Sequence, residues 1–227
     1  MTAFFDYPKS AAFGRVLPKN KIYEHAKASS KLKNLFVRHV DQIVWKYKLA
    51  PKTINLPAKK SVPEIQIFSI TLKTGELHED VLRSIDKAIP FPLIFELHYN
   101  GKQKAIAAFK RPSDADTSKW VTSDYFGTDW QPEDTPRISL PVMLDLRALY
   151  GALLTTLMPH KGDDGEDIEA RVHRMDLIRA KERELEKTAS KLRKEKQFNR
   201  KVGINAQIRT LKQEIEQLTR PQATGEQ

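Results

Sequence analysis

The sequence contains no cysteine, and this absence removes several kinds of chemistry at once. Disulfide bonds, thiol catalysis and thiolate metal sites are excluded. The six histidines show no paired metal-ligand spacing, so neither a metal nor another cofactor is predicted. The glycines are isolated, and no glycine-rich loop that could cradle a phosphate is present, which argues against an ATPase. No serine or threonine lies in a nucleophile-elbow context. The sequence therefore predicts no catalytic centre of these classes.

Long hydrophobic runs are also absent. The longest apolar-rich stretch, residues 140–159, contains Asp145 and Arg147 and predicts a buried helix rather than a membrane span. The first residues lack the basic and apolar regions of a secretory signal. Because 40% of the 227 residues are hydrophobic, the chain can bury a core. We expect a folded cytoplasmic protein without a membrane partner.

Acidic residues are scarce in the first quarter of the chain. Residues 1–60 contain 13 Lys or Arg against three acidic residues, and this surplus of +10 equals the net charge of the whole chain. Residues 61–160 have 10 basic and 13 acidic residues, a balance of −3, and residues 161–220 have 16 and 12, a balance of +4. Such asymmetry indicates a surface that meets a polyanion or an acidic partner.

The pattern over residues 1–160 predicts an α+β domain, with a small, mainly antiparallel sheet covered by helices. Residues 1–28 are expected to be irregular, with the basic run 18–21 in a loop. Apolar residues at steps of three and four predict a helix from Leu32 to Tyr47, capped by Ser29 or Ser30 and carrying His39 on its core face. This helix would end at Pro51.

The following elements are predicted from shorter patterns. Residues 64–73 are rich in β-branched residues and indicate an interior strand. Asn100 and Gly101 form a strong hairpin signal between two expected strands. The complete set is a strand over 64–73, a helix over 81–89, strands over 92–99, 103–110 and 120–126, and a helix over 142–157.

After a polar linker at residues 161–167, residues 168–219 predict a coiled-coil-like arm, and residues 220–227 a disordered tail. The apolar repeat is interrupted near Gly203, so one long helix and an antiparallel helical hairpin turning near Gly203 both fit. The apolar stripe of this arm is too narrow to be buried by the arm alone, so we expect it to bind a second copy of the chain or a larger subunit. The alternative is that the arm folds back on its own domain. The expected partner-binding residues are Ile168, Val172, Leu185, Leu192, Ile204, Ile208, Leu211, Ile215 and Leu218.

Six ordered blocks of the sequence carry a family resemblance: residues 18–21, 43–49, 52–55, 64–68, 85–90 and 195–199. Together they make most of the chain resemble the bacterial family called domain of unknown function 4391. Members of that family tend to be encoded with DNA methyltransferases and helicases in restriction-like or antiphage gene clusters. The resemblance therefore implies a larger complex with a methyltransferase or helicase, and it implies no catalytic residues.

A nucleic-acid surface is the leading site hypothesis. On the predicted first helix, Lys31, Arg38 and Trp45 are seven residues apart and would lie on one stripe. The cations would contact phosphates and the indole would stack on a base, although Trp45 packed under another part of the chain is the alternative. The candidate set is Lys19, Lys21, Lys31, Lys33, Arg38, Trp45, Lys46, Lys48 and Lys52, and Lys27 belongs to the same wider basic patch.

These features predict a non-catalytic accessory subunit of a DNA-modification or antiphage complex. It would contact DNA or RNA through its basic face and its protein partners through the arm. One alternative is a metal-dependent nuclease that uses Glu64, Asp86 and Glu96, although His98 occupies the position where such a motif carries lysine. Another alternative is a protein adaptor whose basic face binds an acidic protein.

Overall fold

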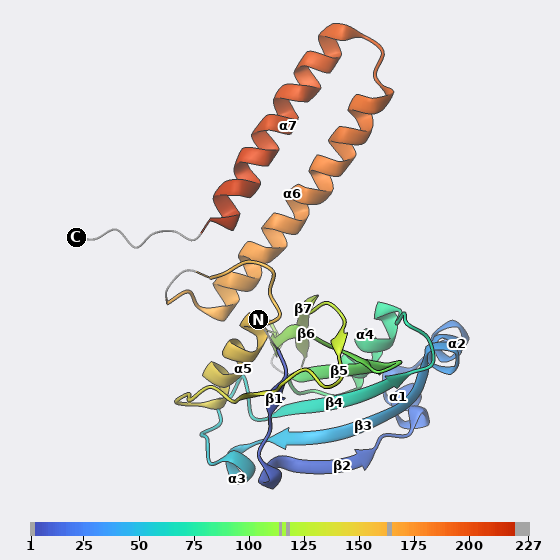
Figure 1. Ribbon diagram of the computed structural model, residues 1–227, viewed down its shortest axis with the longest axis vertical. Coiled ribbons are helices and arrows are strands. Elements are labelled where there is room, and N and C mark those ends of the chain that lie inside the picture. Colours follow the sequence, from blue (N-terminus) through green and yellow to red (C-terminus); the bar gives the residue numbers. More distant parts are fainter. Residues whose placement is uncertain (1–2, 114, 117–118, 163–164, 221–227) are drawn as a thin grey trace, which may run out of the picture. The chain divides into compact units, whose positions relative to one another are not determined.

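The computed structural model describes residues 3–113, 115–116, 119–162 and 165–220 (Figure 1). The chain divides into two compact units, unit 1 from Met1 to Met158 and unit 2 from Pro159 to Gln227. Unit 1 is an α+β domain and unit 2 is a helical hairpin, so the predicted fold class is confirmed. The predicted tail lies outside the described residues except for Arg220. No helix of the described chain combines the length and the apolar character that crossing a membrane requires.

A mixed sheet forms the centre of unit 1. Its strands follow the order β2-β3-β4-β5-β6-β7, with the short β8 paired to β6. Only β4 and β5 run parallel within this sheet, because helix α4 crosses over between them. The strands are β2 (Ala12–Val16), β3 (Val40–Leu49), β4 (Ile65–Leu72), β5 (Leu93–Tyr99), β6 (Lys102–Pro112), β7 (Trp120–Gly127) and β8 (Gln131–Pro132). A separate parallel pair joins β1 (Phe5–Asp6) and β9 (Ile138–Ser139).

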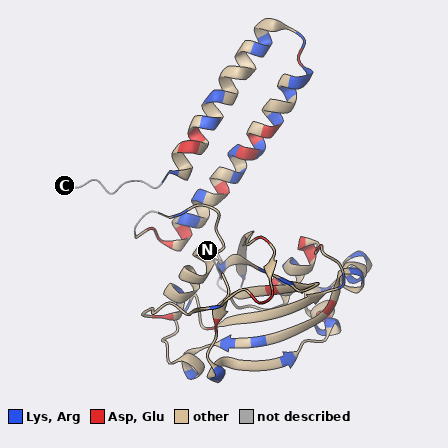
Figure 2. Cartoon of the chain, in the orientation of Figure 1, with Lys and Arg blue, Asp and Glu red and all other residues tan. Residues whose placement is uncertain are grey.

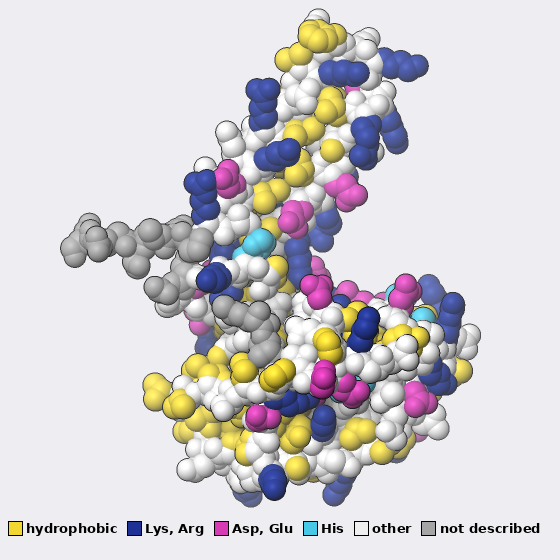
Figure 3. All heavy atoms as spheres, in the orientation of Figure 1, with side chains coloured by type: hydrophobic (Ala, Val, Ile, Leu, Met, Phe, Trp, Pro, Cys, Tyr) yellow, Lys and Arg dark blue, Asp and Glu magenta, His cyan; other side chains and the backbone are white. Residues whose placement is uncertain are grey.

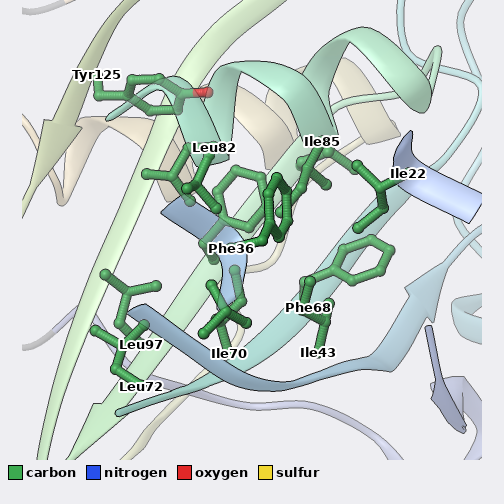
Figure 4. Close-up of a cluster of buried hydrophobic side chains, with 14 of the residues drawn as sticks. Ile22, Phe36, Ile43, Phe68, Ile70, Leu72, Leu82, Ile85, Leu97 and Tyr125 are labelled. Atoms are coloured by element: carbon green, nitrogen blue, oxygen red, sulfur yellow. The ribbon is translucent and has the colours of Figure 1, made fainter. Parts of the chain in front are cut away.

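Helices cover both faces of this sheet. One face packs against α1 (Lys19–Ala26), α2 (Ser30–His39) and α4 (Glu79–Ala88), and their apolar side chains meet the strands in the core shown in Figure 4. On the opposite face, Tyr150 of α5 (Leu146–Thr155) donates a hydrogen bond of 2.7 Å to the Ala108 carbonyl. The remaining helices of unit 1 are the short 3-10 helix η1 (Lys9–Ala11) and α3 (Pro51–Ile54).

The predicted helix from Leu32 to Tyr47 is wrong in its second half. Helix α2 ends at His39, and the chain continues directly as β3. The β-branched and aromatic residues after His39 favour a pleated strand, and β4 pairs with them along the whole of β3. Lys19 and Lys73 donate to the carbonyls of Val40 and Val37 over 2.6 and 3.0 Å, at the end of the helix where cations are favourable.

The first 28 residues are also more regular than predicted. They contain the edge strand β2 and helix α1, and the basic run expected in a loop instead begins α1 after Pro18. Both elements are short, with five and eight residues, so their periodicity is weak in the sequence.

The later strands and helices of unit 1 agree with the predictions. Asn100 and Gly101 have φ of 52° and 71°, the left-handed values that a tight hairpin turn requires. Helix α5 begins at Leu146 rather than at residue 142, because the Asp145 side chain accepts a hydrogen bond of 2.9 Å from the Ala148 N–H and fixes the start of the helix.

Unit 2 is an antiparallel hairpin of α6 (Ile168–Lys194) and α7 (Phe198–Thr219). The chain turns at residues 195–197, so the predicted turn near Gly203 is wrong, and Gly203 lies inside α7. The Glu195 carboxylate accepts hydrogen bonds of 2.8 and 2.9 Å from the next two backbone N–H groups, which supports the turn without a glycine. Lys181 of α6 pairs with Glu214 of α7 at 2.7 Å.

Candidate nucleic-acid interface

Helix α2 and the turn before it carry exposed cations. The Ser29 side chain caps α2 by accepting a hydrogen bond of 3.3 Å from the Leu32 N–H. Lys31 and Arg38 are seven residues apart on this helix, which places them on the same side. Lys27 ends α1 in the left-handed conformation with φ of 50°. Within the described chain, Lys27, Lys31 and Arg38 form neither an ion pair nor a side-chain hydrogen bond, and all three residues are exposed. Figure 2 colours the Lys and Arg positions along the chain blue.

The other predicted cations of these helices have contacts within the protein. Lys19 donates to the Val40 carbonyl, and burial together with the nearby Lys73 lowers the pKa of its ammonium group. Lys19 therefore supports the fold. Lys21 lies 3.5 Å from Glu24, and the Lys33 ammonium lies 5.8 Å from the centre of the Tyr23 ring. Because Lys21 and Lys33 are exposed, such contacts do not prevent them from meeting a ligand.

A second cationic group lies where β2 pairs with β3. The rings of Phe13 and Trp45 are 4.0 Å apart between centroids, and both side chains are half-buried. Arg15 lies 4.7 Å from the Phe13 ring, and the Lys48 ammonium lies 5.9 Å from the Trp45 ring. We call these four residues the aromatic edge, because β2 is the outermost strand of the sheet. The group combines stacking surfaces with the charge of Arg15, because Lys48 is already paired with Glu64 at 2.6 Å.

Trp45 does not share a stripe with Lys31 and Arg38, since it lies on a strand and they lie on a helix. Its ring also stacks on Phe68 at 5.9 Å, and its Nε1 donates a hydrogen bond of 3.0 Å to the Tyr47 carbonyl. Trp45 is thus packed against its own domain on one side. The half-buried ring retains surface beside Phe13.

Two further candidates lie apart from these groups. Lys46 approaches the buried Glu96 at 3.5 Å, and its side chain is part of a network on the face of the sheet opposite to the core cluster. Lys52 is exposed on α3, which follows the end of β3 farthest from α2. The structure therefore brings together the cations of α1 and α2 and, separately, Trp45 with Lys48.

Sequence reasoning missed Phe13 and Arg15. Their only signal is the alternation of the five-residue segment around Gly14, which is too short to distinguish a strand from a loop. The contact between Phe13 and Trp45 depends on the pairing of β2 with β3. The register of this pairing shifts between Ala12 and Arg15, the part of β2 that contains Phe13. Neither feature can be read from the local sequence.

The three carboxylates of the nuclease hypothesis do not converge. Glu64 pairs with Lys48 at 2.6 Å and accepts a hydrogen bond of 2.5 Å from Gln66. Asp86 is buried on α4, on the core face of the sheet, whereas Glu96 points to the opposite face, because it alternates along β5 with core residues Phe95 and Leu97. Among the described residues, no cluster of His, Asp or Glu has the arrangement needed to hold a metal ion.

Each buried carboxylate has its own cationic partner. Lys110 donates to the Asp86 backbone carbonyl over 2.5 Å and lies 3.5 Å from its Oδ1, while the Tyr125 hydroxyl donates to Oδ2. Burial raises the pKa of Asp86, and Lys110 opposes that shift. Arg137 donates two hydrogen bonds, of 2.8 and 2.9 Å, to Glu96, and these raise the pKa of the guanidinium. Removing one partner of such a pair would leave the other buried and uncompensated, so these groups belong to the folded core and leave little capacity for a metal.

The chain combines an α+β unit that carries exposed cations with a helical hairpin. The chain belongs to the family described as domain of unknown function (DUF4391), whose model matches residues 5–215. No curated protein and no solved structure matches the chain. The family description assigns no activity, so the site itself must support any function.

Proposed function

We propose that this protein is a non-catalytic, nucleic-acid-contacting subunit of a larger complex. The observation that carries the proposal is the set of solvent-facing cations Lys27, Lys31 and Arg38 beside α2, which no carboxylate of the described chain neutralises. Unpaired cations on one surface attract a polyanion and release its counterions on binding. The aromatic edge adds Phe13 and Trp45, whose rings can stack on exposed bases.

The scarcity of acidic residues explains why these cations stay unpaired. Residues 1–60 contain only three acidic residues, Asp6, Glu24 and Asp41. Glu24 lies beside Lys21, and Asp41 interacts with Lys19. Lys27, Lys31 and Arg38 form no ion pair within the described chain. Other cations of unit 1 have acidic partners, as Arg83 has Glu79 and Asp124. The lack of such partners beside α2 favours a ligand role for Lys27, Lys31 and Arg38.

The hairpin of unit 2 supports the assembly part of the proposal. Val172 and Leu211 are buried, whereas Leu185, Ile204 and Ile208 are only half-buried, as expected when two helices bury one narrow stripe. A further helix from a partner protein could cover the remainder. A partner that modifies or unwinds DNA, of the kind the family resemblance implies, would bring catalysis to a nucleic acid held by unit 1. Self-association of the arm is the competing outcome.

The test compares Lys31→Gln/Arg38→Gln with a control, Lys60→Gln/Lys102→Gln, that removes two exposed cations elsewhere in unit 1. Binding to a DNA duplex and to a single strand is measured over a series of salt concentrations. The first variant should bind more weakly. The slope of log K against log salt for the duplex should become less steep by about 2, because each phosphate contact contributes about 0.9 to its magnitude. The control should match the wild type.

An unchanged affinity and slope in Lys31→Gln/Arg38→Gln would contradict the proposal. Binding to an acidic protein that DNA cannot displace would favour the adaptor function instead. Purification of the complete chain from its host, after nuclease treatment, tests the assembly part. A methyltransferase or helicase retained by the wild type and lost when Leu185 and Ile208 are replaced by Asp would support it.

A further inference from the structure

The end of the helical hairpin is the most positively charged part of unit 2. We define the arm tip as residues 187–202, the last turns of α6, the connecting turn and the first turn of α7. The arm tip has seven Lys or Arg residues against Glu195 alone, a surplus of +6. The rest of the two helices, residues 168–186 and 203–220, has eight basic and seven acidic residues, a balance of +1. The charge of the hairpin is thus concentrated at one end (Figure 2).

Ion pairs of unit 2 lie mainly away from the arm tip. Arg174 pairs with Glu166 at 2.7 Å and Lys181 pairs with Glu214 at 2.7 Å, both far along the helices from the turn. At the arm tip, Arg200 lies 4.0 Å from Glu195. The other six cations have no ion pair within the described chain: Lys187, Lys191, Arg193, Lys194, Lys196 and Lys201.

Glu195 does little to neutralise this charge. Its carboxylate accepts two backbone hydrogen bonds in the turn, and these N–H groups lower its pKa, so it serves the turn as an anion. Meanwhile Lys187 and Lys191 are four residues apart on α6, and Lys191 and Lys194 are three residues apart on the same helix. Like charges at such spacing in a helix are unfavourable, and an external polyanion would relieve them.

Two apolar side chains are exposed among these cations. Phe198, the first residue of α7, is 78% exposed, and Val202 is 54% exposed. They are four residues apart on one helix, so they lie on the same side. Figure 3 shows hydrophobic side chains together with Lys and Arg at this end of the hairpin. A largely solvent-exposed aromatic ring surrounded by cations is suited to stacking against an unpaired base.

We propose that the arm tip is a second nucleic-acid contact, which binds single-stranded nucleic acid by backbone contacts to its cations and by stacking of a base on Phe198. It shares no residue with the surface of unit 1 and does not depend on the proposed function of that surface. An anionic membrane is less well matched, because a membrane-bound helix needs a broad apolar face and the arm tip offers two exposed apolar side chains. A second arm tip would be repelled by the same charge.

The experiment uses the complete chain and a single-stranded DNA of about 20 nucleotides that carries 2-aminopurine, whose fluorescence falls when it stacks. Lys191→Gln/Lys194→Gln/Lys201→Gln should bind more weakly, with a salt slope reduced by about 2, since each lost contact to a single strand removes about 0.7. Phe198→Ala should weaken binding about fivefold or more and abolish the 2-aminopurine response, because one stacked base is lost.

The matched control is Arg183→Gln/Arg209→Gln/Lys212→Gln, which removes three exposed cations from the rest of the hairpin and should bind as the wild type does. All variants are measured both in the wild-type chain and in the Lys31→Gln/Arg38→Gln chain. Binding lost through the arm tip is then distinguished from binding lost through the surface of unit 1. Equal losses in the arm-tip and control variants, or no loss in either, would overturn the proposal. Binding to vesicles of phosphatidylcholine and phosphatidylserine is measured in parallel. The proposal would also be overturned if the arm-tip variants lost binding to these vesicles and kept binding to the single-stranded DNA.

Discussion

Unit 1 and unit 2 use buried surface differently. In unit 1 the sheet is covered on both faces, and central residues such as Phe68 and Phe95 are fully buried. In unit 2 two helices cover each other along one stripe, so Leu211 is buried while Leu185 is half-buried. Layered elements bury whole side chains, whereas a two-helix layer buries parts of them. Unit 1 therefore buries its core side chains within its own layers, whereas unit 2 leaves much of its apolar stripe half-buried.

The same contrast applies to lysine. Lys110 of unit 1 is 1% exposed and contacts Asp86, and burial lowers the pKa of its ammonium group while Asp86 opposes that shift. Lys191 of unit 2 is exposed and has no ion pair within the described residues. An internal charge must be paired to be tolerated, so it contributes to folding. A charge left outside remains available to a ligand, and the arm tip has six cations without an ion pair within the described residues.

The largest expected effect is that of Lys110→Ala. This change leaves the Asp86 carboxylate and two backbone carbonyls buried without their cation, which should lower the free energy of unfolding by about 3–5 kcal/mol. Urea unfolding followed by circular dichroism measures it. Lys191→Ala should leave the unfolding free energy of the chain nearly unchanged.

A double variant sharpens this prediction. Lys110→Met/Asp86→Leu replaces the pair with apolar side chains and should recover most of the lost stability, since burying neither charge avoids the desolvation cost. Equal stabilities of Lys110→Ala and the wild type would show that the ammonium is not a structural element.

The next largest effect is expected for Leu211→Ala in α7. Leu211 is 7% exposed, and its loss should weaken the packing between α6 and α7 by about 2–3 kcal/mol, near the low end for such changes because a two-helix layer can collapse around the gap. Hydrogen exchange of the α7 amides measures this local stability. Faster exchange in α7 with unchanged exchange in β4 would show that the two units respond separately, and uniform acceleration in both would contradict it.

Local patterns predicted several elements correctly because those elements depend on neighbouring residues. The turn at Asn100 and Gly101 needs left-handed backbone that asparagine and glycine adopt readily, and the sequence carries that signal directly. The boundary between α2 and β3 has no such signal. Its position at His39 is set by the pairing of β3 with β4 and by Lys19 and Lys73, which reach the helix end from distant parts of the chain.

The candidate site shows the same division. The exposed cations of α2 were predictable from composition, because few acidic residues lie near them in the sequence. The aromatic edge was not, since Phe13 and Trp45 meet only after β2 pairs with β3. The hairpin turn was misplaced because glycine is the usual marker of a break, whereas here the Glu195 side chain supports the turn and glycine is absent from it.

The smallest effect, that of Gly203→Ala, has a sign that depends on where the hairpin turns. Gly203 lies inside α7 with helical neighbours, and a Cβ built there meets no atom within 4 Å. Alanine should therefore stabilise α7 by about 1 kcal/mol, because it loses less backbone entropy than glycine when the helix forms. Gly101→Ala in unit 1 provides the opposite case, since φ of 71° is unfavourable for alanine and the change should destabilise by about 1 kcal/mol. Thermal unfolding of unit 1 and hydrogen exchange of α7 measure the two effects. If Gly203→Ala destabilised α7 as Gly101→Ala destabilises its hairpin, the turn would have to be near Gly203, and Phe198 would no longer begin a helix at the arm tip.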